Sequence, residues 1–224
     1  MNNSVGNTAR LLGAGLRALL VLTVVCGVLY PLAVTGAAQA LFHDKANGSE
    51  VSADGEVVGS ELIGQRYDLP LKKGQETAEP DLKWFQPRPS NGLGENTVNT
   101  QYKLLLSGAT NLSGDNKDLI RQVKDAKAAV VKDNSTADHR VKPSDVPADA
   151  VTSSGSGLDP HISPAYADLQ VHRVAARNHL DVRQVQKLVD AHTDGRTLGF
   201  IGEPRVNVLR LNIALKELAG AGGS

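Results

Sequence analysis

The feature that most constrains this chain is a run of 25 residues, from Ala18 to Phe42, that contains no charged side chain. About 20 apolar residues in a helix cross roughly 30 Å of hydrocarbon, so the run is long enough to span a membrane. Because a bilayer offers no water, a lone segment satisfies its backbone polar groups there only as a helix. Pro31 lies inside the run and has no N–H, which predicts a kink. We therefore expect a single N-terminal transmembrane helix over residues 18–42.

The charges beside this run predict its orientation. Arg10 and Arg17 precede it, and the first acidic residue of the chain is Asp44. Basic residues gather on the cytoplasmic side of membrane helices, so we expect residues 1–17 in the cytoplasm and residues 43–224 outside. A cleaved signal peptide has the same order of charges, and Ala38-Gln39-Ala40 is an acceptable cleavage site. The run exceeds the apolar part of a signal peptide, about 7 to 15 residues, which favours the membrane anchor.

Charge and cysteine content exclude several classes of protein. The 24 basic and 24 acidic side chains cancel, and without Arg10 and Arg17 the outer part has 22 against 24, a net charge of −2. This balance does not indicate binding to nucleic acid. Cys26 is the one cysteine of the chain, so a secreted disulfide framework is excluded.

The outer part mixes strand and helix signals, which indicates one extracytoplasmic α+β domain over residues 43–219, followed by a flexible tail over 220–224. Asp54-Gly55 predicts a hairpin turn, since glycine tolerates positive φ. Ser163-Pro164 is typical of a helix start, and Asp181 with Gln184 of a capping box. The expected elements are a hairpin within 49–67, a loop over 68–99, a helix over 117–132, a loop over 133–149, helices over 164–178 and from 182 to Gly195, a strand over 198–201 and a helix over 207–218.

Trp84 and Phe85 form the one aromatic cluster of the chain, next to Pro87 and Pro89. Exposed aromatic residues mark interfaces, so this cluster could bind a partner. The chain has only eight aromatic residues, 4 Tyr, 1 Trp and 3 Phe, and burial of the pair in the core is the favoured interpretation.

Ser156 and His161 raise the alternative of a membrane-anchored or secreted serine hydrolase, with the serine as nucleophile and the imidazole as base. Against this, Ser154 stands where a nucleophile elbow needs glycine. A glycine-permitted turn with Asp159 ahead of Pro160 is favoured. The chain has no GxxxxGK[ST] sequence for phosphate, and its six histidines show no HxxxH spacing, so neither a nucleotide site nor a metal site of its own is indicated.

Several motifs, taken in order, are similar to those of one family. They are Tyr30-Pro31-Leu32, Gly59-Ser60-Glu61-Leu62-Ile63-Gly64-Gln65, Phe85 with Arg88-Pro89-Ser90, Ser107-Gly108 with Asn111-Leu112, the run from Ser154 to Pro164, Gly202 to Asn207, and Leu211 to Leu215. Over nearly the whole chain they resemble the C subunit of the bacterial Kdp high-affinity potassium-transporting P-type ATPase. Residues 69–83 look like an insertion relative to that family, and Asp115-Asn116-Lys117 stands where Asn-Pro is common. Both departures fall in loops, where added length costs little stability.

The resemblance implies a non-catalytic accessory subunit in the bacterial inner membrane. Its implied partners are a channel-like potassium-binding subunit, a P-type ATP-hydrolysing subunit and a very small stabilising peptide. The family's role is chaperone-like and raises the ATP affinity of the hydrolysing subunit, so ATP is expected only through that subunit. Because the predicted topology leaves about 17 residues on the ATP side, the effect is expected to be indirect.

We further expect the membrane helix to pack against the channel-like subunit and the outer domain to cap the potassium entrance. The expected partner contacts are Pro31 in the membrane helix and, in the outer domain, the turn formed by Ser156, Gly157, Leu158 and Asp159. No catalytic or metal-binding residue is expected.

Overall fold

The computed structural model describes residues 3–75, 77–95 and 105–221 of the chain. These residues divide into two compact units, one within Met1–Glu50 and one within Val51–Ser224.

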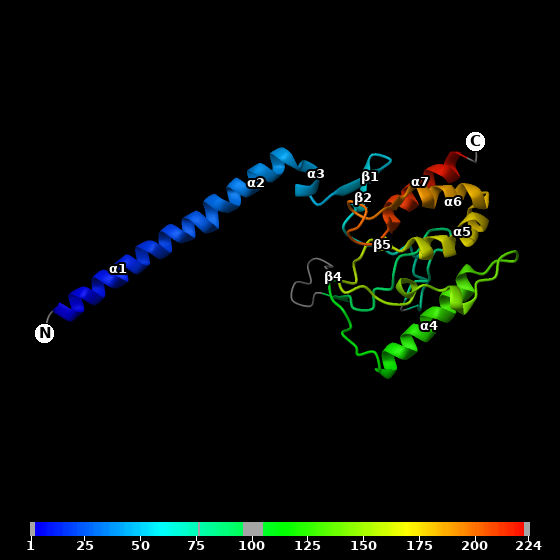
Figure 1. Cartoon of the computed structure of the whole chain (residues 1–224), viewed down its shortest axis with the longest axis horizontal. Helices are drawn as coiled ribbons and strands as arrows, with labels where there is room; N and C mark the ends of the chain where they lie inside the picture. Colours follow the sequence, from blue (N-terminus) through cyan, green and yellow to red (C-terminus); the bar gives the residue numbers. More distant parts are fainter. Residues whose placement is uncertain (1–2, 76, 96–104, 222–224) are drawn as a thin grey trace. The chain divides into compact units, whose positions relative to one another are not determined.

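The first unit is a long helix. It consists of α1 (Asn3–Val24), one π-helical turn η1 (Val25–Leu29) and α2 (Tyr30–Leu41), which Figure 1 shows as a continuous rod, followed by the short α3 (His43–Ala46). The helical stretch from Ser4 to Leu41 is long and apolar enough to cross a membrane; an 18-residue window within it has a mean hydropathy of 2.3 and no buried residue. Among the described residues it is the one such helix, so the single N-terminal membrane-spanning candidate is confirmed.

The second unit opens with the predicted hairpin. Strands β1 (Glu50–Ala53) and β2 (Glu56–Ser60) pair across Asp54 and Gly55, whose φ values of +54° and +83° suit the tight turn. Lys216 lies 2.7 Å from the Asp54 carboxylate and ties the turn to the last helix.

Two small antiparallel sheets follow. Strands β3 (Gly94–Glu95) and β4 (Leu105–Leu106) form one pair. The other sheet has the order β5-β7-β6, built from His161–Ile162, Arg205–Asn207 and Thr193–Asp194. Together with the helices, these sheets confirm the α+β class.

Four helices supply most of the core, and two 3-10 turns lie between the first pair. The helices are α4 (Lys117–Asn134), α5 (Pro164–Asn178), α6 (Val182–Ala191) and α7 (Val208–Ala221); the turns are η2 (Pro143–Asp145) and η3 (Ala148–Ala150). The predicted caps are present: Ser163 Oγ accepts from the Tyr166 N–H, and Asp181 with Gln184 forms the capping box. Figure 1 shows α5, α6 and α7 grouped together, and their buried side chains, such as Val174, Val189 and Leu215, form one apolar cluster.

The prediction for residues 191–207 is wrong in three places. Helix α6 ends at Ala191 instead of Gly195, because Thr193 and Asp194 pair with β7. The predicted strand over 198–201 is a tight turn, closed by two 2.9 Å hydrogen bonds between Thr197 and Ile201. The strand lies instead at Arg205–Asn207, directly before α7.

At the C-terminus, α7 continues through Ala221, past the point where the tail was expected to begin. Residues 222–224 of that predicted tail, and residues 96–99 of the predicted loop, lie outside the described residues.

Candidate functional site

The turn singled out in the sequence lies in a segment that we call the SGSG loop, residues 154–161, which links η3 to β5. Gly157 has a φ of +69°, which glycine adopts readily because it has no Cβ. The Ser156 hydroxyl accepts from the Leu158 N–H at 3.1 Å, and the Asp159 carboxylate accepts from the His161 N–H at 3.0 Å. The loop is therefore the Asx-type turn that was favoured for it.

Two segments distant in sequence hold the SGSG loop by its backbone. The Gly64 N–H donates to the Leu158 carbonyl at 2.8 Å. The Ser156 carbonyl accepts from the Gly108 N–H at 3.1 Å and from the Ser107 hydroxyl at 2.9 Å. Three of the motifs in the sequence thus meet at one place.

This meeting requires glycine. A Cβ on Gly64 would lie 2.5 Å from the Asp159 carbonyl oxygen, and one on Gly92 would lie 2.3 Å from the Gly108 oxygen. Both distances are well inside van der Waals contact with backbone atoms that cannot swing away. The SGSG loop is therefore fixed on a rigid support.

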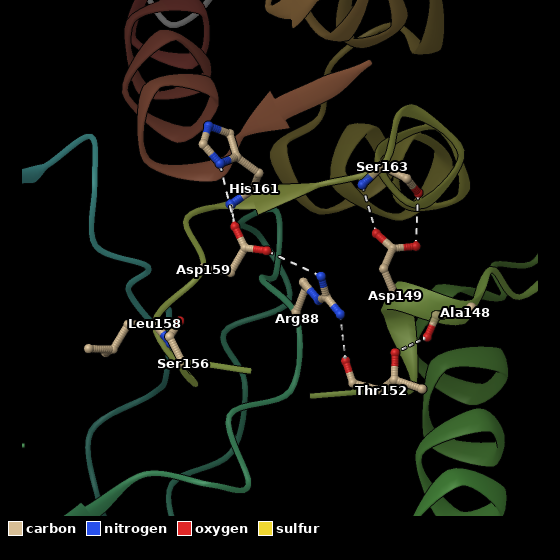
Figure 2. Close-up of polar contacts among 9 residues, drawn as sticks. All are labelled: Arg88, Ala148, Asp149, Thr152, Ser156, Leu158, Asp159, His161 and Ser163. Carbon is tan, nitrogen blue, oxygen red and sulfur yellow. Dashed lines mark hydrogen bonds and ion pairs between the residues drawn. The ribbon is translucent and has the colours of Figure 1, made fainter. Parts of the chain in front are cut away.

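Arg88 joins this loop to the preceding turn, as Figure 2 shows. Its Nη1 lies 3.2 Å from Asp159 Oδ2, and its Nη2 donates to the Thr152 carbonyl at 3.4 Å. The two paired side chains are 24% and 30% exposed. Arg88 Nε is buried without a hydrogen-bond partner among the residues that the structure describes. A half-buried ion pair thus lies directly beside the turn.

The ring of His161 lies on the other side of the same carboxylate, with Nδ1 3.4 Å from Asp159 Oδ1. Burial lowers the pKa of His161, the nearby Arg205 lowers it further, and the charge of Asp159 opposes both effects. The lowered pKa favours the neutral imidazole, so Arg88 is the main partner of the Asp159 charge.

The geometry does not assemble the hydrolase pair. Within the described residues no hydrogen bond joins Ser156 to His161, and Figure 2 places them at opposite ends of the turn with Asp159 between. The serine hydroxyl is engaged by the Leu158 N–H, and a nucleophile needs a base within hydrogen-bond reach. The structure offers no support for serine hydrolase chemistry at this site.

A cavity of about 460 Å³ opens beside the loop. Its wall is mostly apolar, with Arg66 and Arg88 as its cations and Asp159 as its acid. Two of its apolar residues, Ile63 and Leu105, are 48% and 61% exposed. The cavity is thus an open apolar surface, of a kind that suits contact with another apolar surface.

The segment Leu82–Gln86, which lies just before Arg88 in the chain, belongs to no helix or strand. Its backbone groups bond instead to buried side chains. Asn212 of α7 accepts from the Phe85 N–H and donates to the Phe85 carbonyl, both at 2.9 Å. Gln170 of α5 does the same for Gln86, at 2.7 and 3.1 Å. The two amide side chains therefore take the place of a neighbouring strand.

Arg173 completes this support from α5. Its guanidinium donates to the carbonyls of Leu82 and Trp84 and to the side-chain oxygens of Asn134 and Gln170, the last at 2.6 Å. Burial lowers the pKa of Arg173 to about 10, so the group keeps its charge at neutral pH.

Phe85 is fully buried within this network, so the core interpretation of the aromatic pair is confirmed for it; Trp84 is half-buried. Sequence reasoning missed Gln170, Arg173 and Asn212. The available signal was their position, since Gln170 and Arg173 lie on the same helix stripe as the apolar Ala167 and Val174.

Residues that could hold a metal do not gather in the described parts of the chain, where no group of three or more His, Cys, Asp or Glu side chains lies close enough. His139 and His172 stack, with ring centroids 3.9 Å apart and ring planes 2° from parallel.

Pro31, the other expected contact, lies in the first unit. It is the second residue of α2, and the residue before it, Tyr30, follows the π-helical turn η1 and donates its N–H five residues back, to the Val25 carbonyl. The helix thus contains one widened turn just before Pro31, the residue at which we expect a kink.

Comparison with known proteins covers nearly the whole chain. Residues 12–217 match the family described as "KdpC: K+-transporting ATPase, c chain". A protein of Streptomyces avermitilis named "Potassium-transporting ATPase KdpC subunit" is 84% identical over 218 residues, which are 97% of this chain and 98% of that protein. Proteins of the same name from Streptomyces coelicolor and Kineococcus radiotolerans are 72% and 44% identical, over 99% and 98% of this chain and 99% and 100% of their own lengths. The chain therefore belongs to the KdpC family of potassium-transporting ATPase subunits.

Proposed function

We propose that this chain is the non-catalytic accessory subunit of an ATP-driven high-affinity potassium uptake complex, which it stabilises and whose ATP affinity it raises. The observation that carries the proposal is the family match over residues 12–217, which takes in both the candidate membrane helix and the folded domain. The match to the Streptomyces avermitilis protein likewise takes in 97% of this chain.

The proposed topology rests on charge. Arg10 and Arg17 are the only charged residues before Asp44, so the positive-inside rule places the N-terminus in the cytoplasm and the second unit outside. The proposed partners are a channel-like potassium-binding subunit, a P-type ATP-hydrolysing subunit and a small stabilising peptide.

ATP is bound, in this proposal, only through the hydrolysing subunit. A subunit that binds one conformation of the pump more tightly shifts the pump toward it, and a ligand that prefers the same conformation then binds more tightly. This linkage needs no contact between ATP and the present chain. It suits a topology in which ATP and the folded domain are on opposite sides of the membrane.

The SGSG loop is the proposed contact in the second unit. Ser156 is exposed, yet its carbonyl is held by Gly108 and Ser107, so the loop presents a fixed shape. A rigid exposed loop loses little conformational entropy when it binds. The open apolar cavity beside it, with Ile63 and Leu105, extends the same surface.

The test is purification of the tagged full-length chain from its native membrane in mild detergent after growth under potassium limitation. We expect a P-type ATPase to be retained, with potassium-stimulated hydrolysis. Complexes prepared without this chain should need a higher ATP concentration for half-maximal activity. Recovery of a lone chain that begins near Leu41 would instead mean that Ala38-Gln39-Ala40 is cleaved, and an unchanged ATP requirement would contradict the chaperone role.

The loop contact has its own matched pair of variants. Ser156→Arg adds a large charged side chain to the exposed loop, whereas Ala176→Arg adds the same group to the exposed face of α5. We expect weaker retention of the partner subunits with the first variant and wild-type retention with the second. Equal retention of both would place the contact elsewhere on the domain.

A further inference from the structure

The membrane helix has fewer N–H donors than backbone acceptors at its π-helical turn. The Tyr30 N–H donates to the Val25 carbonyl. Leu29 is the N-cap of α2, and its carbonyl is the first in that helix to accept a regular α-helical bond, from the N–H four residues later. The carbonyls in between are those of Cys26, Gly27 and Val28. Pro31 has no N–H, so Leu32 supplies the one remaining donor for these three acceptors.

Cys26 is the clearest case. Its α-helical donor would be the Tyr30 N–H, which is bonded to Val25, and its π-helical donor would be residue 31, which is proline. Neither bond is therefore available to the Cys26 carbonyl. The Leu32 N–H can satisfy only one of the carbonyls of Gly27 and Val28, so the other carbonyl is also left without a donor.

The helix offers no side chain to replace these donors. A hydroxyl in a helix reaches the carbonyl three or four residues before it, so Thr23 and Thr35 are out of reach of residues 26–28. Gln39, the amide of this run, exchanges hydrogen bonds with Asn47 at 3.1 and 3.2 Å.

These carbonyls also lie deep in the apolar run. Cys26 is 9 residues from Arg17 (26 − 17) and 18 from Asp44 (44 − 26), or about 13 Å and about 27 Å at 1.5 Å per residue. Water is scarce at that depth, and an unsatisfied carbonyl in hydrocarbon costs several kcal/mol. Access is open, because Gly27 has no side chain and, its chain neighbours and the surrounding backbone of its own helix aside, no atom of the described residues comes within 4 Å of where its Cβ would be.

We propose that a hydrogen-bond donor on a transmembrane helix of a partner subunit, a hydroxyl, amide or indole group, binds the free carbonyls at Cys26–Val28. This proposal rests on the proposed function and names the chemistry of its membrane contact. The partner helix approaches at Gly27, where close backbone contact is possible. Pro31 has no N–H to donate within the helix, so these carbonyls remain available to a donor from the partner subunit.

The first test is Pro31→Ala in the full chain, purified with its complex. Alanine restores the N–H at residue 31, which then satisfies the Cys26 or Gly27 carbonyl within the helix. Interhelical hydrogen bonds in membranes are worth amounts that correspond to about threefold to about twentyfold in an equilibrium. We therefore expect partner subunits to be lost from Pro31→Ala complexes faster by a factor in that range. Leu32→Ala, which changes the next side chain without changing the number of N–H groups, is the control.

A double-mutant cycle then separates the missing hydrogen bond from a change in helix shape. A photo-cross-linking residue at Val28 identifies the neighbouring partner segment, and its Ser, Thr, Asn, Gln, Tyr or Trp residue is replaced by an apolar one. We expect this replacement to weaken retention when Pro31 is present and to have no further effect with Pro31→Ala.

Three results would overturn the proposal: equal retention of Pro31→Ala and wild-type chains, additive losses in the cycle, or cross-links to partner segments without a donor residue. All three presuppose that the wild-type chain retains its partners, which is the proposed function. A wild-type chain that retains none would overturn both proposals together.

Discussion

The two units of this protein satisfy irregular backbone in opposite ways. In the second unit, the irregular segment Leu82–Gln86 has its N–H and carbonyl groups bonded by Gln170, Arg173 and Asn212 from two helices. In the first unit, the carbonyls of Cys26–Val28 have fewer N–H donors in their own helix than they need. The irregular segment of the folded domain is therefore bonded within the chain, whereas the membrane helix, in our proposal, is completed by a partner subunit.

Arg173→Ala is expected to have the largest effect, and it tests the hydrogen bonding within the second unit. This change leaves the carbonyls of Leu82 and Trp84 and the side-chain oxygen of Asn134 without their donor, and it opens a cavity next to the fully buried Phe85. Each unsatisfied buried group costs about 1–3 kcal/mol, so we expect a loss of about 3 kcal/mol or more in the free energy of unfolding. The measurement is urea unfolding of the full chain in detergent micelles, followed by near-UV circular dichroism.

Arg177→Ala is the control for this variant, because Arg177 is exposed one turn later on the same helix. It is expected to change the free energy of unfolding by about 0.5 kcal/mol or less. A loss below about 1 kcal/mol for Arg173→Ala would show that water replaces the guanidinium, and the comparison between the units would fail.

A smaller loss is expected from Asn212→Ala, which removes the two 2.9 Å hydrogen bonds to the Phe85 backbone. Both Phe85 groups are buried, so we expect a loss of about 2 kcal/mol. Lys216→Ala, one turn later on α7, removes an exposed ion pair with Asp54 and is expected to have a smaller effect, because solvent screens such a pair. Thermal unfolding of both variants under one condition gives the ranking, and a larger effect of Lys216→Ala would contradict it.

Local signals in the sequence predicted the elements that local chemistry determines. The hydroxyl of Ser163, the capping box at Asp181 and the Asp54-Gly55 turn each act within a few residues, and all three are present in the structure. The apolar run that forms the candidate membrane helix is equally local. These features account for the α+β class and for most helix starts.

What the sequence could not predict depends on pairing between distant residues. Thr193 leaves the helical pattern because β7 is present to pair with it, and Leu158 is fixed by Gly64, far away in the chain. The buried polar side chains of α5 lie on its apolar stripe, but the sequence does not tell which distant segment they bond. The composition of the SGSG loop could be seen in the sequence, but the hydrogen bonds from Gly64 and Gly108 that hold it could not.

The smallest expected effect concerns pH, and it again separates the two units. The membrane run has no acidic or basic side chain between Arg17 and His43, whereas the second unit holds a half-buried His161 beside Asp159. Burial, and then Arg205, lower the pKa of His161 below its ordinary 6.5. Because the pKa of His161 is lower in the folded state, the unfolded chain binds a proton more readily. The stability of the folded state therefore falls as the pH decreases from 6.5 toward the folded-state pKa. We therefore expect the second unit to lose stability as the pH falls from 8 to 5, and His161→Asn to reduce this loss.

The free energy of unfolding of the full chain, measured at both pH values, gives the difference. His179→Asn, at the exposed end of α5, is the control for removal of an imidazole. If His161→Asn left the difference between the two pH values unchanged, the acid sensitivity of the domain would come from groups other than the one that adjoins the SGSG loop.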